Sequence, residues 1–351
     1  MNHPSPTALE PEEDAGATPP AGQPEGAAAA PSPSPFLTAG IRPDEAMAEA
    51  VRKIMVRQYQ VMLANEAGCR GGKSIDAVHD MRVATRRLRV AFRLFGAYYK
   101  RGLVRDLEAD LRKTGRTLGA ARDLDVFNDT ARRYLRTQPK QQRGELDPLL
   151  ASWKRQRQMA HRELVDYFDG PRYRRLVEKL GDFLATPGAG VAAPKAAPAP
   201  YQVRHVLSST VWARYEAVRA YEAILPAAVA TDLHALRIEC KYLRYTLEFF
   251  QEVLGEGAAA LVRQVIVVQD HLGEIQDADV AGRLLAEYLA KAFKEQAAAS
   301  GGELADLEGV TRYLSYRRDQ ARQMTAAFPP VWKQIDSLKF RRRLAAVTAS
   351  L

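Results

Sequence analysis

The sequence predicts an all-α protein built from two similar helical halves. Apolar residues recur at helical spacing along most of the chain, whereas no alternating strand pattern of useful length occurs. The residue pattern of the helix predicted from Asp76 to Tyr99 recurs from Thr231, with an offset of 155 residues. The segments LGAARDLDV, from Leu118, and LGEIQDADV, from Leu272, match at five positions with an offset of 154. Two matches in the same order indicate an internal duplication.

Composition divides the chain into four parts. Residues 1–40 are rich in Pro, Ala, Gly and Ser and have few large apolar side chains, which predicts a disordered tail. Residues 41–185 form the first helical half. Residues 186–200 contain four prolines and no periodic pattern, and they are predicted to be a linker. Residues 201–351 form the second helical half.

Each half is predicted to hold several helices in the same order. The repeated helix of each half follows an entry helix and is followed by a long helix that contains the LG segment. Gly and Pro residues separate the elements. The ranges expected for the first half are about 43–67, 76–99, 103–135, 145–168 and 172–184. Those expected for the second half are about 201–224, 231–254, 262–285 and 306–328.

The repeated helix carries basic residues on one face and apolar residues on the other. At about 100° per residue, the first copy gathers its cations in a stripe roughly 80° wide and roughly 21 Å long. This first basic face consists of His79, Arg82, Arg86, Arg89 and Arg93. The second basic face consists of His234, Arg237, Lys241 and Arg244. The counterpart of Arg93 is Glu248, so the two faces differ at one end.

The charge balance favours a polyanionic partner. Five of the 42 acids lie in the first 40 residues, which carry no Lys or Arg, so the rest of the chain has 51 bases against 37 acids. A linear basic face suits a nucleic acid, an acidic membrane or a phosphate polymer, because its charges form an array. Solvated helices also carry such faces. The repetition of the same His and the same spacing favours a binding role.

The starts of the two repeated helices strengthen this expectation. Asp76 and Thr231 occupy equivalent positions and are good N-cap residues. If they cap, His79 and His234 lie in the first turn, where unpaired backbone N–H groups and the helix dipole favour an anion. A bound anion would raise the pKa of both histidines, so affinity is expected to rise as pH falls.

The paired aspartates and the two cysteines are residue types that can ligate a metal, but their spacing does not favour a metal site. Asp123 with Asp125, and Asp277 with Asp279, are two residues apart and so point about 200° apart on a regular helix. We therefore expect one carboxylate of each pair to orient a neighbouring Arg or to cap a kink. Cys69 and Cys240, the only cysteines, lack metal-ligand spacing, and Cys240 is expected to be a buried thiol. No metal and no cofactor are predicted.

The sequence shows no signal peptide and no apolar run as long as a membrane span. We expect a soluble protein of the cytoplasm that makes no contact with a membrane.

The doubled H-x-x-R-x-x-x-[RK]-x-x-R helix and the doubled LG-x-x-x-D-x-D-V segment resemble the conserved histidine α-helical domain family, CHAD. The resemblance spans roughly residues 43–345. It implies two helical bundles related by approximate two-fold symmetry, with a basic groove or pore between them. It also implies binding of inorganic polyphosphate and association with polyphosphate granules.

By motif, the resemblance places the binding site on the two basic faces, and we expect these faces to meet across the interface of the halves. Arg93 and Arg122 extend the set asymmetrically, because their counterparts are Glu248 and Gln276. Looser matching of later helices adds Arg157, Arg317 and Arg322.

Two other functions remain open at this stage. A nucleic-acid-binding protein would need aromatic residues among the cations, and the nearby ones are Tyr242 and Tyr245. A phosphatase or kinase acting on polyphosphate is the second alternative. The hydrolase domain fused to some CHAD chains uses alternating Glu-x-Glu-x-Lys on a strand, and the nearest match here is an acidic run in the tail without Lys. No P-loop or Gly-rich dinucleotide loop is present, so we expect a protein that binds and does not catalyse.

Overall fold

The computed structural model describes residues 40–72, 74–192, 201–298 and 307–351, and within these ranges it is all-α. The expectation for the tail, and that for residues 193–200 of the linker, concern residues outside the described ranges. Where the chain is described, pairing of the strand type is limited to two isolated bridges, one of them between Tyr99 and Val191. The prediction of an all-α fold is confirmed.

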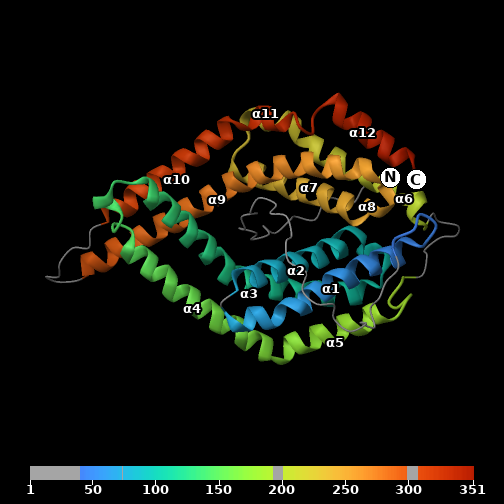
Figure 1. Cartoon of the computed structure of the whole chain (residues 1–351), viewed down its shortest axis with the longest axis horizontal. Coiled ribbons are helices and arrows are strands. Elements are labelled where there is room, and N and C mark those ends of the chain that lie inside the picture. The colour runs from blue at the N-terminus through green and yellow to red at the C-terminus, as the bar shows by residue number, and fades with distance from the viewer. Residues whose placement is uncertain (1–39, 73, 193–200, 299–306) are drawn as a thin grey trace, which may run out of the picture.

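Five long helices make up the first half of the chain (Figure 1). The first helix begins at Met47, a turn later than expected, and the long third helix continues past both LG-segment aspartates. The five are α1 (Met47–Gly71), α2 (Ile75–Phe95), α3 (Arg101–Thr137), α4 (Asp147–Asp169) and α5 (Pro171–Ala185).

The second half contains seven α-helices within the described ranges, from four residues in α8 to 43 in α9. The predicted stop at Gly255 is present, because α8 ends at Leu254 and Gly255 adopts a φ of 72°. The seven are α6 (Val203–Arg219), α7 (Ala230–Phe249), α8 (Gln251–Leu254), α9 (Glu256–Ala298), α10 (Glu308–Ala326), α11 (Phe328–Trp332) and α12 (Leu338–Ala349).

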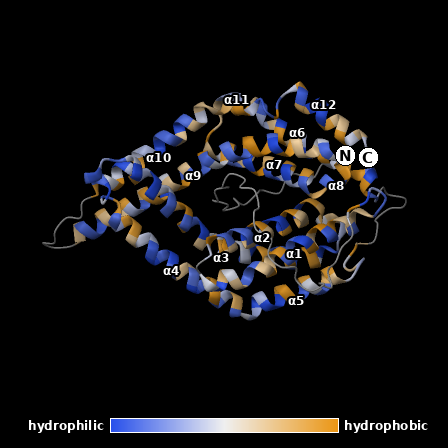
Figure 2. Ribbon diagram, viewed as in Figure 1, coloured by the Kyte–Doolittle hydropathy of each residue, from blue (hydrophilic) through white to orange (hydrophobic). Residues whose placement is uncertain are grey.

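The hydrophobic core runs through both halves. One cluster of buried side chains draws on α1, α2, α5, α6, α7, α9 and α12. At its centre Phe95 of the first half packs edge-on against Phe250 of the second, with ring centroids 5.5 Å apart. Figure 2 shows hydrophilic and hydrophobic residues alternating along the helices, as amphipathic helices require. Burial of the shared apolar surface fixes the two halves against each other.

A second core joins the far ends of the long helices. The last third of α3 and the start of α4 pack there against the end of α9 and the start of α10. Figure 1 shows these four helices converging at one end of the molecule. Tyr134 and Tyr313 lie with ring centroids 4.7 Å apart in this cluster. The halves therefore meet in two buried clusters that follow each other along α3, with Leu118 in the first and Phe127 in the second.

Residues 186–192 of the predicted linker lie within the described ranges. Helix α5 ends at Ala185, and the chain then turns back onto the first half. Lys100 donates its backbone N–H to the Gly190 carbonyl at 2.7 Å, and Ala192 donates to the Tyr98 carbonyl at 2.9 Å. The first part of the predicted linker is thus attached to the start of α3.

The predicted N-caps of the repeated helices are wrong. Helix α2 begins at Ile75, and Ser74 is its N-cap, with its hydroxyl accepting the Ala77 N–H at 3.0 Å. Helix α7 begins at Ala230, and the N–H of its N-cap, Val229, donates to the Asp232 carboxylate at 3.0 Å. Asp76 and Thr231 therefore lie inside the first turn. The histidines follow at the fifth helical position, where the backbone N–H is already paired within the helix.

Candidate functional site

The first basic face lies along α2, with burial that decreases toward its C-terminal end. Arg82 is buried, His79, Arg86 and Arg89 are half-buried, and Arg93 is exposed. The apolar side of the helix packs into the main core through Leu88 and Phe92. The amphipathic pattern thus presents the last two turns of this face to a ligand in solution.

A glycine and an aspartate of α3 position Arg82. The carboxylate of Asp123 lies 3.6 Å from the Arg82 guanidinium. A Cβ atom at Gly119 would lie 3.6 Å from Arg82 Nε, so the glycine leaves room for the arginine against α3. A Cβ atom at Gly273 would lie at the same distance from Arg237 Nε. The Gly of each LG segment therefore faces the first arginine of a basic face.

The second aspartate of the segment orients a different arginine. Arg157 of α4 donates from Nε to Asp125 at 3.1 Å and from Nη2 to the Gly72 carbonyl at 3.1 Å. The expectation that an aspartate of the pair orients an Arg is confirmed in the first half, where both do so. In the second half Asp279 pairs with Arg283 on its own helix at 3.4 Å. Arg157 thus ties α4 to the turn before α2.

The second basic face, on α7, is more deeply buried. Arg237, Lys241 and Arg244 are 3, 5 and 7% exposed. His234 Nδ1 lies 3.0 Å from the Gln276 side-chain oxygen. Asp270 of α9 lies in the same neighbourhood, where burial raises the pKa of its carboxyl group and the charges of Arg244 and Arg237 oppose that rise. This face is therefore partly neutralised by the protein itself.

The two basic faces meet around Tyr245. Arg86 Nε donates to the Tyr245 hydroxyl at 2.9 Å, and the Arg244 guanidinium lies 4.8 Å from the ring centroid. Glu248 forms ion pairs with Arg87 of α2 and, at 3.3 Å, with Arg244. Burial alone would raise the pKa of the Tyr245 phenol, but the charges of Arg86, Arg244 and Arg87 lower it below its ordinary value.

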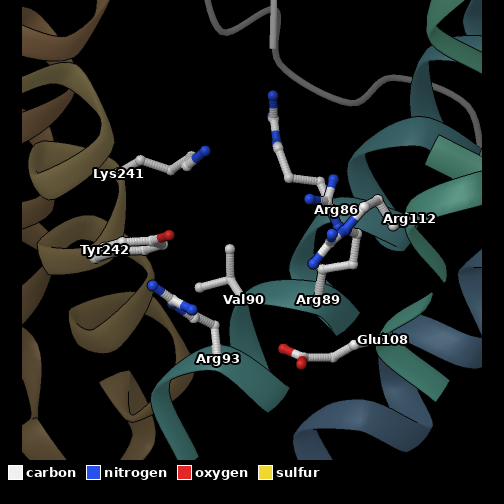
Figure 3. A pocket seen from close by; sticks show the side chains of 8 residues that line it. All are labelled: Arg86, Arg89, Val90, Arg93, Glu108, Arg112, Lys241 and Tyr242. Carbon is white, nitrogen blue, oxygen red and sulfur yellow. The ribbon is translucent and has the colours of Figure 1, made fainter. Parts of the chain in front are cut away.

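A pocket opens beside this contact, and we call it the arginine pocket (Figure 3). Arg86, Arg89, Val90 and Arg93 of α2, Glu108 and Arg112 of α3, and Lys241 and Tyr242 of α7 line it. Its empty space is about 490 Å³ and is open to solvent. Five cationic side chains thus face one carboxylate. Like charges held close together repel, so an anion in this pocket would relieve the repulsion.

His79 lies at the other end of the first basic face. Burial lowers the pKa of its imidazole, the neighbouring Arg122 lowers it further, and Arg86 and Arg82 act in the same direction against Asp80. The imidazole is therefore neutral at pH 7 in the free protein. Arg122 Nε is buried and has no hydrogen-bond partner. The charge of Arg122 therefore acts on the imidazole of His79.

The remaining predicted residues lie apart from the pocket. Arg317 is buried and donates from Nη1 to the Gln320 side chain at 2.8 Å. Arg322 is exposed and pairs with Asp319 one turn earlier on α10. No described contact brings either arginine to the two basic faces. The structure therefore groups the cations of α2, α3 and α7 and leaves these two outside the group.

Sequence reasoning missed the part of the pocket that α3 supplies. Arg112 and Glu108 lie outside the repeated motif, and Arg112 stands where the second half has Ile266. The spacing of Arg112, Arg116 and Arg122 along α3 offered a weak signal, because charged residues at such spacing are common on exposed helices. Across the described residues, no group of three or more His, Cys, Asp or Glu could hold a metal ion.

The fold and the site define a helical protein with a pocket that is lined by five cationic side chains from both halves. The family model for the CHAD domain matches residues 53–286. The chain therefore belongs to the CHAD domain family. The crystal structure of the CHAD domain from the plant Ricinus communis matches with a TM-score of 0.63 and 25% identity, covering 90% of this chain and 97% of that one.

A second solved structure and two curated sequence relatives also match the chain. PptA from Streptomyces chartreusis matches with a TM-score of 0.62 and 16% identity, covering 82% of this chain and all of that one. Uncharacterized proteins of Mycobacterium tuberculosis strains CDC 1551 and H37Rv are each 28% identical over 248 residues, or 67% of this chain. The chain spans less than half of their length, because the matches cover 44% of them. Among the described helices, none combines the length and hydrophobicity of a membrane span.

Proposed function

We propose that this protein binds inorganic polyphosphate and does not catalyse its conversion. The arginine pocket is the observation that supports this function most directly. Arginine offers a planar fork that can take two phosphate oxygens at once, and the pocket brings four arginines and Lys241 together from both halves. The continuation of cations along α2 to His79 suits a linear ligand with regularly spaced charges.

The proposal includes the arrangement of the two halves. We infer an internal duplication with approximate two-fold symmetry, in which α2 and α7 are equivalent and the basic faces form one groove. The equal placement of Gly119 against Arg82 and of Gly273 against Arg237 supports this equivalence. The cytoplasm and the surface of polyphosphate granules are the proposed location, since the ligand would recruit the protein there.

A nucleic-acid partner has less support from the geometry. Single-strand binding without sequence preference relies on exposed aromatic rings on which bases stack. Tyr242 and Tyr245, the aromatic residues expected beside the basic faces, are 7 and 0% exposed. Neither ring offers a free face to a base.

Competition tests the choice of partner. Labelled long-chain polyphosphate bound to the purified protein is challenged with short single-stranded DNA at equal phosphate concentration. We expect the polyphosphate to stay bound, and its displacement by DNA would refute the proposal. Incubation with labelled polyphosphate and a divalent metal ion, with and without nucleotide, tests catalysis. Release of phosphate or of a nucleotide product would make the protein an enzyme.

Binding is expected to strengthen as pH falls, through His79. In the free protein burial and Arg122 hold the pKa of His79 below 6.5, and a bound phosphate chain raises it. The complex therefore takes up a proton, and affinity rises as pH falls from the bound-state pKa toward the free-state pKa. Titration between pH 8 and 5.5 measures this gain. His79→Gln is the control that should flatten the profile, and an unchanged profile in this variant would exclude a direct role of His79.

A further inference from the structure

The arginine pocket has no equivalent on the second-half side of the contact between α2 and α7. With offsets of 155 in the repeated helix and 154 in the LG segment, its lining residues can be compared with their counterparts. Arg86 and Arg89 correspond to Lys241 and Arg244, so two cations are retained. Four other positions differ: Val90 corresponds to Tyr245, Arg93 to Glu248, Glu108 to Val262 and Arg112 to Ile266.

Three of these differences, at Val90, Arg93 and Arg112, remove space or positive charge, whereas the change from Glu108 to Val262 removes a carboxylate. Tyr245 is buried and fills the place of the small Val90 side chain, and its hydroxyl accepts a hydrogen bond from Arg86. Glu248 supplies a carboxylate where the first half has Arg93, and it pairs with Arg87 and Arg244. Ile266 packs against the main core and carries no charge. The second-half position thus already contains the protein's own anion.

The first-half side has more cations than carboxylates in its lining. Val90 leaves space, Arg93 is exposed, and Arg112 of α3 points into the pocket opposite Lys241 (Figure 3). Glu108 is the carboxylate in the lining, and the charge of Glu239 also acts on Arg93 and Lys241. The five cations of the lining still outnumber these two carboxylates. A multiply charged anion would balance the excess, and phosphate groups joined in a short chain provide several charges within a few ångströms.

We propose that the contact between α2 and α7 holds one phosphate-binding pocket per chain, on the first-half side, and that Arg112 is one of its phosphate-contacting residues. This inference rests on the proposed function, and it specifies which half of the site holds the ligand. Tyr245 and Glu248 occupy the corresponding place on the other side. The two basic faces therefore differ in phosphate binding although they are similar in sequence.

Calorimetric titration of the full chain tests this inference. The probe is sodium tripolyphosphate, which is short enough to occupy one pocket, and long-chain polyphosphate is titrated in parallel. We expect the wild-type protein to bind one tripolyphosphate per chain. Arg112→Gln should lower the affinity for both ligands about tenfold, because it removes a charge-assisted contact. Arg112→Lys should restore part of the affinity, because it keeps the charge and loses the fork.

Arg136→Gln is the matched control. It removes the same charge from the exposed far end of the same helix, about 36 Å along α3 from Arg112, and its affinity should stay within twofold of wild type. Wild-type affinity in Arg112→Gln would overturn the inference. It would also be overturned if the wild-type chain bound two tripolyphosphates with equal affinity, or bound none. If long-chain polyphosphate binds wild type but is insensitive to Arg112, the proposed function stands and only this inference fails. If it does not bind wild type, the proposed function fails.

Discussion

Replacing both Arg89 and Arg93 with glutamate is expected to weaken polyphosphate binding at least a hundredfold. The two reversals leave the arginine pocket with three cations and three carboxylates, so its attraction for an anion disappears. Each lost charge-assisted hydrogen bond is worth about 1.5–3 kcal/mol, and two such losses exceed about a hundredfold in affinity. Fluorescence anisotropy with labelled polyphosphate at fixed salt measures the change.

The positions suit a charge reversal because they tolerate a polar substituent. Arg93 is exposed and Arg89 is half-buried, so helical content by circular dichroism should not change. Reversal of the deeply buried Arg237 or Lys241 would instead place a carboxylate in the interior. The matched control reverses Arg132 and Arg136, which are exposed at the far end of α3.

The control separates a local effect from one of net charge. It alters the net charge by the same amount, but its two positions lie about 30–36 Å along α3 from the pocket residue Arg112. This distance is well beyond the screening length of about 8 Å at physiological salt. Its affinity should change less than about threefold. An equal loss in both variants would mean that the ligand responds to total charge and that the pocket has no special role.

The sequence was sufficient for the long helices because apolar periodicity is a local property, although α12 was not among the helices predicted. It also identified the basic residues of α2 and α7, since repetition of the same spacing separates a selected face from an ordinary solvated one. The role of the LG-segment aspartates followed from helix geometry alone. Residues two apart cannot face the same way, and Asp123 and Asp125 indeed reach Arg82 and Arg157 on different helices.

The starts of α2 and α7 could not be derived in the same way. Several residues near each start can act as caps, and the structure uses Ser74 at one and an aspartate inside the turn at the other. The choice depends on where the preceding chain enters the helix, which tertiary packing decides. As a result, His79 and His234 lie beyond the unpaired backbone N–H groups of the helix termini.

Contacts between helices were also beyond the reach of periodicity. Nothing in the spacing of α3 shows that Arg112 and Lys241 line the same pocket, because this arrangement depends on how α3 and α7 are placed around α2. The burial of Tyr245 has the same origin. For Arg322 the alignment of later helices suggested a ligand contact, which stays a prediction, and the structure places its side chain in a surface ion pair with Asp319.

Glu248→Ala is expected to lower the free energy of unfolding by about 3 kcal/mol. Glu248 is the carboxylate that pairs with Arg87 and with the buried Arg244, and both guanidiniums also lie against Tyr245. Removing one partner of a largely buried ion pair leaves uncompensated charge in a medium of low dielectric constant, which costs about 3–5 kcal/mol when burial is complete. Urea unfolding, with the midpoint and slope both fitted, measures the loss.

The same variant tests whether Glu248 acts as the protein's own anion. If it does, polyphosphate should raise the melting temperature of Glu248→Ala more than that of wild type, because the ligand supplies the missing negative charge and binds only the folded state. Glu222→Ala is the control, since Glu222 is half-exposed and pairs with Arg219 at the surface, where loss of a pair costs less than about 1 kcal/mol. If Glu248→Ala unfolds at the wild-type urea concentration, or gains no more from polyphosphate than wild type does, Glu248 is not a substitute for a phosphate. The asymmetry between the two basic faces would then need another physical cause.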